Sequence, residues 1–480
     1  MPFPYIDDLM LNLNDSERKS ILNHYSIIDS SDNLLICKYI QNIANPNSGD
    51  LNVNRMLKSR AFNQITDILT SDYHIQNKGN FSPHDQTLLR LKKKILLARV
   101  ISKTLNQNRT GPFKIFLNSI IAEAKKNEVY EVLLEGLLLK KYVFALKEGA
   151  NQFMKIDQEI SFYEMCQKRS YFANDCYFKI IINNNLMKFN NNKAFHKYIL
   201  RAIRQLKEDY QTYKSQQINY YLHIILMFYF EKQKKYTISA KYCKTLYSIV
   251  KNSPVVYREE RLGNVLINLS QYKTFTENFN EASKYAKEAQ KHYIENSNNY
   301  LLSKDQEFHI YFYHKKYEKA TVCLNELLKH KLIDSGQFTG AKYIYYKSSL
   351  LFAQKQYKQS YTLLNKSLEI EKEKSRWNIS LRIMNIMLCI ELGKIDEASR
   401  LLETLRKYVQ RHEKNSEIKH RDIMIVKLLR ELEKDGFTYK KENKTIPKML
   451  KDLSIKGKPT SWEHYSPELI PFHEWMGNKA

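Results

Sequence analysis

Apolar residues recur along most of the chain at the spacing of an amphipathic helix. Between Ser82 and about Leu105 they form one row that is widened on one side (Leu88, Leu91 and Ile95, with Leu89, Leu96 and Val100). Residues three and four positions apart share a helix face, so this spacing predicts a helix with one buried face. Serine at the N-cap and proline at the first helical position, here Ser82 and Pro83, mark its start.

Polar breaks divide the rest of the chain into further helices. Downstream breaks are predicted at 183–192, 252–254, 296–299, 334–336, 374–377 and 412–415. Upstream, helices are predicted within 14–44 and at 52–70, 113–126 and 128–148, with a flexible joint at 76–81. No segment alternates apolar and polar residues over the length of a strand, so essentially no sheet is expected. The predicted domains are a helical N-terminal region (1–75), helical pairs (82–215), repeats (216–412), and a terminal helix with an aromatic tail (413–480).

An internal repeat dominates the C-terminal half of the chain. Five times, a large residue is followed three positions later by a small one (Tyr236 and Ser239, Phe279 and Ala282, Tyr317 and Ala320, Tyr357 and Ser360, Ile395 and Ala398). Two antiparallel helices approach closely only where a small side chain lies at their crossing, and the large residue fills the wedge at the turn. One pair cannot bury its apolar face alone, so pairs stack and share a core. The pattern predicts consecutive antiparallel helix pairs, and a similar pair is expected within 115–180.

The turn sequences resemble those of a known repeat family. The run from Leu392 to Ala398 looks like the turn of a tetratricopeptide repeat, and so do the runs 315–320 and 279–282. The resemblance covers roughly 218–410. It implies an all-α fold, an α-solenoid of antiparallel pairs whose first helices line a concave surface for a protein or peptide. The layout is also similar to uncharacterised helical-repeat proteins of Bacteroidetes-type bacteria, which implies a bacterial source and no particular activity.

The composition agrees with a long helical chain. Among 480 residues there are only 12 glycines and 10 prolines, whereas sheets and barrels need turn residues at short intervals. Six scattered cysteines without a C-x-x-C pair indicate reduced thiols. The N-terminus has no signal-peptide pattern, and no apolar run approaches the roughly 18 residues of a membrane span. We therefore expect a cytoplasmic protein.

The net charge of +26 is the one compositional outlier. It indicates attraction to nucleic acid, acidic protein or anionic lipid, or else the codon usage of an AT-rich genome, which favours Lys, Asn, Ile and Tyr. Part of the charge lies on the helix that starts at Ser82, without an intervening acid (Arg90, Lys92, Lys93, Lys94, Arg99 and Lys103). These residues are either phosphate contacts to nucleic acid or a solvated face opposite the apolar row.

Two surfaces are predicted to bind a partner. Counting back from the turns places a set of residues in the concave groove (Tyr221, Phe228, Phe275, His309, Phe312, Tyr313, Lys342, Tyr345, Phe352 and Met387). They would either bind a peptide or helix through aromatic anchors, or meet neighbouring helices or the chain's own tail. The aromatic tail has its own set (Trp462, Tyr465, Phe472 and Trp475). It is either a docking peptide for another subunit or a cap that folds back on the last repeats.

No catalytic, metal-binding or cofactor-binding motif occurs in the sequence. His473-Glu474 does not form an H-E-x-x-H pair, and there is no phosphate-binding loop, dinucleotide-binding turn or nucleophile elbow. The sequence therefore predicts a non-enzymatic scaffold or adaptor that binds a protein or peptide without a cofactor. The alternative is a nucleic-acid-associated or regulatory protein that uses the basic N-terminal helices. The oligomeric state is left open.

Overall fold

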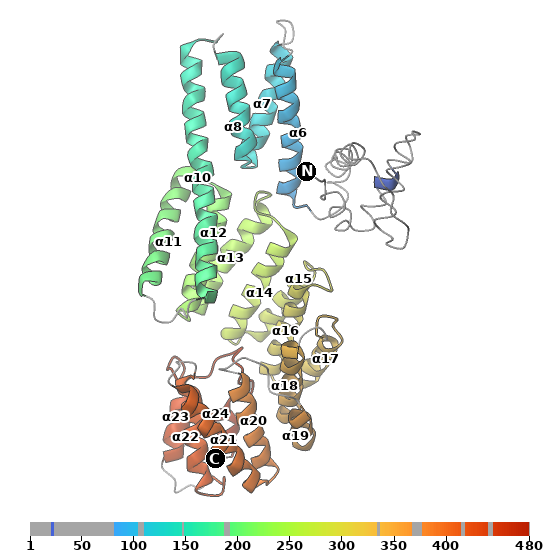
Figure 1. Cartoon of the computed structure of the whole chain (residues 1–480), viewed down its shortest axis with the longest axis vertical. Helices are drawn as coiled ribbons and strands as arrows, with labels where there is room; N and C mark the ends of the chain where they lie inside the picture. The colour runs from blue at the N-terminus through green and yellow to red at the C-terminus, as the bar shows by residue number, and fades with distance from the viewer. Residues whose placement is uncertain are drawn as a thin grey trace, which may run out of the picture. The chain divides into compact units, whose positions relative to one another are not determined.

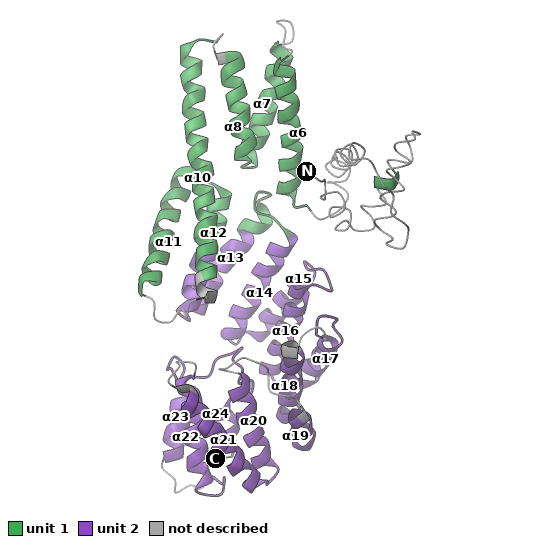
Figure 2. Ribbon diagram, in the orientation of Figure 1, with its two compact units in different colours: residues 1–222, 249–258 green, residues 223–248, 259–480 purple. Residues whose placement is uncertain are grey.

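The computed structural model describes residues 21–23, 81–103, 110–145, 148–186, 193–333, 337–366, 377–413, 418–439 and 445–479 (Figure 1). Within these ranges every regular element is helical and no strand occurs, as predicted. The predicted N-terminal region, 1–75, lies outside the described residues except for the helical residues 21–23. The chain divides into two compact units, residues 1–222 with 249–258 and residues 223–248 with 259–480 (Figure 2).

The first unit is a set of long helices. Its elements are α6 (Pro83–Lys103), α7 (Thr110–Lys126), α8 (Tyr130–Lys140), the π-helix η2 (Lys141–Ala145), α10 (Ala150–Leu186), α11 (Lys193–Tyr213) and the first part of α12 (Gln216–Lys232). The helix predicted at 128–148 is therefore an α-helix that continues as a π-helix. The predicted start of α6 is confirmed, because the Ser82 hydroxyl oxygen accepts a hydrogen bond from the amide of Asp85 at 3.1 Å.

The buried face of α6 is narrower than predicted. Leu91, Ile95 and Ala98 are buried, as the apolar row implies. The prediction that Leu96 and Val100 widen this face is wrong, since these side chains are 62% and 59% exposed. The reason is that α6 packs on α7 and α8 through a single stripe, which leaves the flanking positions in solvent.

The second unit is built from successive helix pairs. After the end of α12 and most of α13 (Tyr236–Asn252), the pairs are α14 (Glu259–Phe275) with α15 (Phe279–Gln290), α16 (Asn298–Tyr313) with α17 (Tyr317–Leu328), α18 (Gln337–Ala353) with α19 (Tyr357–Lys366), and α20 (Trp377–Glu391) with α21 (Ile395–Glu413). They are followed by α22 (His420–Glu433), α23 (Thr445–Ser454) and the short α24 (Phe472–Gly477). Figure 1 shows the two helices of each pair side by side, joined by a tight turn.

The repeat pattern predicted these pairs correctly. Each large residue of the pattern is the first residue of a second helix, as with Tyr317 in α17 and Ile395 in α21. The small residues three positions later are all 0% exposed (Ser239, Ala282, Ala320, Ser360 and Ala398). They lie where the two helices of a pair cross, so no larger side chain fits there without displacing a helix. The chain is thus a tetratricopeptide-like helical repeat protein, as the turn sequences indicated.

The turns share one backbone geometry. Two positions before each large residue, the backbone is left-handed (Lys234 φ 59°, Glu277 φ 59°, Lys315 φ 57°, Lys355 φ 62° and Gly393 φ 69°). The amide of the next residue donates to the carbonyl five positions back, as from Lys316 to Tyr311 at 2.9 Å. This closure is the usual way to end a helix, and glycine normally occupies its left-handed position. In the first unit, Glu128 (φ 53°) precedes Tyr130 in the same way, so the turn between α7 and α8 has the repeat geometry as well.

Candidate binding site at the repeat turns

The C-terminal tail, residues 455–479, belongs to the second unit and packs against the repeats of that unit. Four of its apolar residues are buried in the same core as the repeats (Leu469, Phe472, Trp475 and Met476). Burying a side chain of this size is worth roughly 1.5–3 kcal/mol, so these four contribute roughly 6–12 kcal/mol before entropy is counted. In the structure the tail folds back on the repeats of its own chain, and its docking on another subunit stays a prediction.

The ring of Tyr465 contacts three residues of the predicted groove set. Its centroid lies 5.1 Å from that of His309, 5.4 Å from that of Phe275 and 5.9 Å from that of Tyr313. The amide of Tyr465 donates to the Tyr313 hydroxyl at 2.9 Å, and the Tyr345 hydroxyl donates to the Pro467 carbonyl at 2.9 Å. This part of the predicted groove is therefore covered by the tail and does not face solvent.

The left-handed turn residues hold the tail by ion pairs. Lys234 pairs with Glu463, Glu277 pairs with Lys456 at 2.6 Å, and Lys315 pairs with Glu474 at 3.7 Å. Each of these turn residues comes from a different helix pair, so the tail crosses three successive turns. The next turn residue, Lys355, has no ion pair with a residue that the structure describes. At three of the turns, therefore, a charged residue that contacts the tail occupies a position that glycine usually fills.

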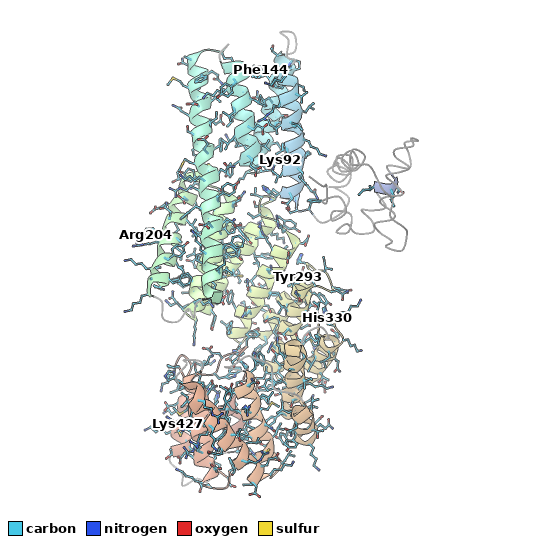
Figure 3. All side chains as sticks on the ribbon, in the orientation of Figure 1. Lys92, Phe144, Arg204, Tyr293, His330 and Lys427 are labelled. Atoms are coloured by element: carbon cyan, nitrogen blue, oxygen red, sulfur yellow. The ribbon has the colours of Figure 1, made fainter. Side chains whose placement is uncertain are left out.

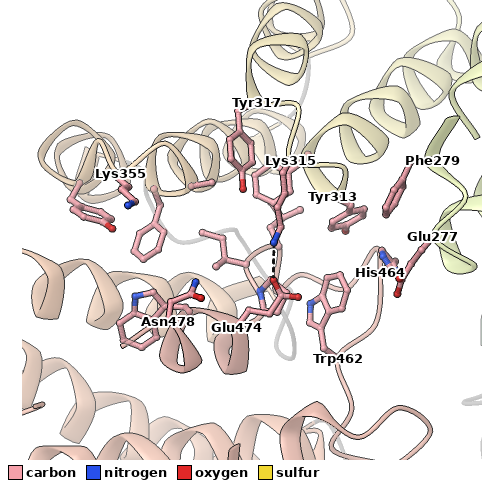
Figure 4. Close-up of a pocket in the computed structure, with 18 residues that line it drawn as sticks. Glu277, Phe279, Tyr313, Lys315, Tyr317, Lys355, Trp462, His464, Glu474 and Asn478 are labelled. Atoms are coloured by element: carbon pink, nitrogen blue, oxygen red, sulfur yellow. Dashed lines mark ion pairs between the residues drawn. The ribbon is translucent and has the colours of Figure 1, made fainter. Parts of the chain in front are cut away.

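A half-open pocket of about 390 Å³ lies between the tail and the turns (Figure 4). The turns contribute the first residues of three second helices, Phe279, Tyr317 and Tyr357, together with Phe312 and Phe352 from the first helices. The tail contributes the opposite side (Trp462, His464, Leu469, Ile470, Pro471 and Trp475). The pocket is therefore a composite of repeat and tail, and its walls are mainly aromatic.

Charged and polar residues line the open side of the pocket. They are exposed to solvent and come from both parts (Glu277, Lys315, Lys355, Glu474 and Asn478). Figure 4 shows Lys315 pointing toward Glu474, with the ion pair marked. A cavity that combines aromatic walls with charged and polar residues can take one large apolar group from a ligand.

Two histidines, His309 of α16 and His464 of the tail, are held in their neutral form. Burial lowers the pKa of His309 to about 4, although the carboxylate of Asp305 opposes this shift. Burial likewise lowers the pKa of His464 to about 4, against the influence of Glu277. The His309 Nε2 lies 3.0 Å from the Tyr346 hydroxyl, while its Nδ1 has no hydrogen-bond partner. Both rings act as aromatic packing surface at neutral pH.

The remaining predicted groove residues have other neighbours as well, and Met387 lies in the core that also contains the buried residues of the tail. Met387 is 2% exposed and belongs to the core, and Lys342 pairs with Asp305 at 3.2 Å. Phe228 is 9% exposed and lies 5.0 Å beneath the Nζ of Lys232. Tyr221 belongs to the first unit, where its ring lies 5.6 Å from that of Tyr177.

Most residues of the predicted basic patch face carboxylates of neighbouring helices. On α6, Lys92 pairs with Glu131 at 2.9 Å, and Arg99 pairs with Glu135 at 2.9 Å (Figure 3 labels Lys92). Arg90 and Lys94 share Glu123. The carboxylates offset much of the local positive charge, and nucleic-acid binding by this helix stays a prediction.

The described residues contain no arrangement that suggests chemistry. No three metal-binding side chains converge within the described ranges. Burial raises the pKa of the described cysteine thiols, to about 11 for Cys166 and Cys389, which disfavours a nucleophilic thiolate. Among the described helices, none combines the length and apolar character needed to cross a membrane. The absence of enzymatic activity and the cytoplasmic location stay predictions.

The sequence comparisons return no relative, whereas the structure comparison returns distantly similar solved structures. No protein-family model and no curated protein matches the chain. A Rap protein complexed with competence and sporulation factor has 16% identity and a TM-score of 0.47, over 68% of this chain and 87% of that one. The apo form of RapI has 14% identity and a TM-score of 0.45, over 76% and 86%. A STAND signal-transduction ATPase with a tetratricopeptide repeat sensor, from Pyrococcus horikoshii, has 13% identity and a TM-score of 0.44, over 91% and 68%. At these identities the likeness concerns the helical-repeat fold alone.

Proposed function

We propose that this protein is a non-catalytic interaction scaffold that holds a protein partner by one large apolar side chain inserted into the composite pocket. The observation that carries the proposal is the construction of the pocket. Equivalent residues of three successive turns meet the tail there and leave an aromatic cavity open to solvent. Its volume is in the range of pockets that bind small ligands or single anchor side chains, roughly 300–1,000 Å³.

The tail acts as a fixed wall of this site. Releasing it would expose Leu469, Phe472, Trp475 and Met476 and would break the buried ion pair between Arg421 and Glu468. A partner that displaced the whole tail would have to offset the free energy of these lost contacts before it bound with any net affinity. A partner that inserts one side chain beside the tail avoids this cost, since the site is already formed.

A pocket-filling substitution tests the proposal. Ala353, the last residue of α18, lines the pocket, so Ala353→Trp should fill it. Gln359→Trp, on the exposed side of α19, adds the same bulk outside the pocket and is the matched control. Wild type and Gln359→Trp should retain a protein partner from a lysate of the source cells, and Ala353→Trp should lose it.

The salt dependence separates this function from the nucleic-acid alternative. Retention through an apolar anchor should survive moderate salt, whereas retention through phosphates falls steeply between roughly 50 and 200 mM. The proposal is contradicted if Ala353→Trp retains the partner as well as wild type does. It is also contradicted if the only retained material is nucleic acid that Lys92→Glu, Lys93→Glu and Lys94→Glu together release.

A further inference from the structure

A basic furrow lies on α15, α16 and α17, next to the composite pocket. Phe279 belongs to both, and its ring stacks on that of His314 with the centroids 5.2 Å apart. The furrow has two lobes, of about 490 and 360 Å³, which share Lys287, Tyr311 and Lys319. Five lysines line it (Lys284, Lys287, Lys304, Lys316 and Lys319), against two glutamates (Glu307 and Glu326).

The two glutamates are already engaged by two of the lysines. Glu307 is 6% exposed, and its carboxylate oxygens lie 3.8 Å from the Nζ atoms of both Lys287 and Lys304. It also accepts hydrogen bonds from Gln290 at 2.9 Å and from Tyr311 at 3.0 Å. Glu326 pairs with Lys304 at 2.9 Å. No carboxylate of the furrow is left for the other three lysines.

Those three lysines, Lys284, Lys316 and Lys319, are exposed and have no ion pair with any residue that the structure describes. The positive charge of Lys316 and Lys319 acts on the neighbouring His314. Burial lowers the pKa of His314, and the ammonium groups of Lys316 and Lys319 lower it further. A cationic hollow whose ammonium groups lack counter-charges favours an anionic ligand.

We propose that the basic furrow binds an acidic stretch of the protein partner, adjacent to the apolar side chain that enters the composite pocket. The furrow is not uniformly charged, since Val322, which is 60% exposed, and the ring of Tyr311 lie among the lysines. This alternation matches a polypeptide that mixes carboxylates with apolar residues better than it matches a phosphate backbone. This inference depends on the proposed function in one respect, namely that the same partner occupies both the pocket and the furrow.

Fluorescence anisotropy with a labelled peptide of alternating Glu and Leu tests the furrow separately from the pocket. Replacing Lys284, Lys316 and Lys319 by Glu should raise the Kd of this peptide by at least ~10-fold, because three attractions become repulsions. The control makes the same change of net charge at Lys347, Lys358 and Lys427, exposed residues that line neither hollow (Figure 3 shows Lys427 on α22). All six side chains are exposed, so both triple variants should fold, which circular dichroism checks.

The outcomes are distinct from those of the pocket test. The furrow is supported if the first triple variant weakens peptide binding, the control triple does not, and Ala353→Trp still binds the peptide. The furrow assignment is overturned if both triple variants weaken binding equally, since net charge alone would then be responsible. It is also overturned if wild type fails to bind the peptide, or if a single-stranded oligonucleotide binds more tightly than the peptide and is released by the same three substitutions.

Discussion

Arg421 and Glu468 form a buried ion pair that joins α22 to the tail. Nε of Arg421 lies 2.6 Å from Oε2 of Glu468, and Nη2 lies 2.8 Å from Oε1. The remaining donors of the guanidinium are satisfied as well, because Nη1 donates to the carbonyls of Leu453 at 3.0 Å and Thr460 at 2.7 Å. Glu468 also accepts from the amide of Phe472 at 2.7 Å, at the start of α24. Through this ion pair, α22 is tied to the end of α23 at Leu453, to Thr460, and to the start of the buried part of the tail at Glu468.

Removing one charge of this pair should destabilise the second unit strongly. Glu468→Gln leaves the guanidinium of Arg421 buried without a counter-charge, which costs about 3–5 kcal/mol in comparable cases. Glu474→Gln is the control within the same tail, because its exposed pair with Lys315 is worth at most about 1 kcal/mol. Urea unfolding, followed by tryptophan fluorescence, measures the loss of stability in both variants. Equal, small losses for the two variants would show that the tail is not anchored by this pair.

Replacing a left-handed turn residue by glycine should raise the free energy of unfolding. Lys355 has φ 62° and is exposed, so Lys355→Gly should raise the free energy of unfolding by about 1 kcal/mol by removing a side chain from a disfavoured backbone conformation. Gly393→Lys reverses the change at the equivalent turn. A Cβ atom at Gly393 would meet no neighbour within 4 Å, so its expected loss of about 1 kcal/mol is conformational. Thermal unfolding of both variants should give shifts of opposite sign, and shifts of the same sign would contradict the argument.

Local features of the fold could be predicted from the sequence, whereas only part of the pocket lining could be (Phe312, Tyr313, Phe352, Trp462 and Trp475). The crossing residues Ala282 and Ala320 and the anchors Phe279 and Tyr317 belong to short, repeated patterns, and the structure places them as those patterns require. The left-handed turns were harder to recognise, because only Gly393 among the five has the residue type that signals them.

The pocket depends on contacts between residues far apart in the sequence. Lys315, Lys355 and Tyr357 line it, but the repeat pattern assigns positions of this kind only to the turn. No local signal shows that Glu474 returns to Lys315 or that Trp462 lies 5.5 Å from the ring of Tyr313. The one available signal was the concentration of aromatic residues in the tail, which predicted a burial site without locating it.

Enlarging a crossing residue should separate the helices of a pair. Ala320 is 0% exposed between α16 and α17, so Ala320→Leu overfills the crossing and should cost about 1–3 kcal/mol or more. Val322→Leu adds a methylene to the same helix at a position that is 60% exposed, and it should be nearly neutral. Urea unfolding of the two variants compares them directly. If Ala320→Leu left the free energy of unfolding unchanged, the helix crossing would contain space for a larger side chain, although Ala320 is fully buried there.

Acidification should loosen the tail before it unfolds the helices. The pKa of His309 and that of His464 are about 4 when the tail is docked, against 6.5 for a solvated histidine, so protons bind preferentially to the released state. The stabilisation is therefore complete above about pH 6.5 and is lost as the pH falls toward 4. Asp422 opposes this trend, because burial raises its pKa to about 6 and its protonation favours the folded state. Burial also lowers the pKa of His473 in the tail, so three histidines act against one carboxyl group and the net effect of acid is release.

The fluorescence of Trp462 and Trp475 should report this release between about pH 6.5 and pH 4. His464→Phe retains an aromatic ring against Phe275 and Phe279 but cannot take up a proton, so it should move the transition to lower pH. His420→Gln, at an exposed position of α22, should leave the transition where it is in wild type. A transition that His464→Phe and His420→Gln shift equally would show that general acid unfolding, and not the titration of the tail, releases it.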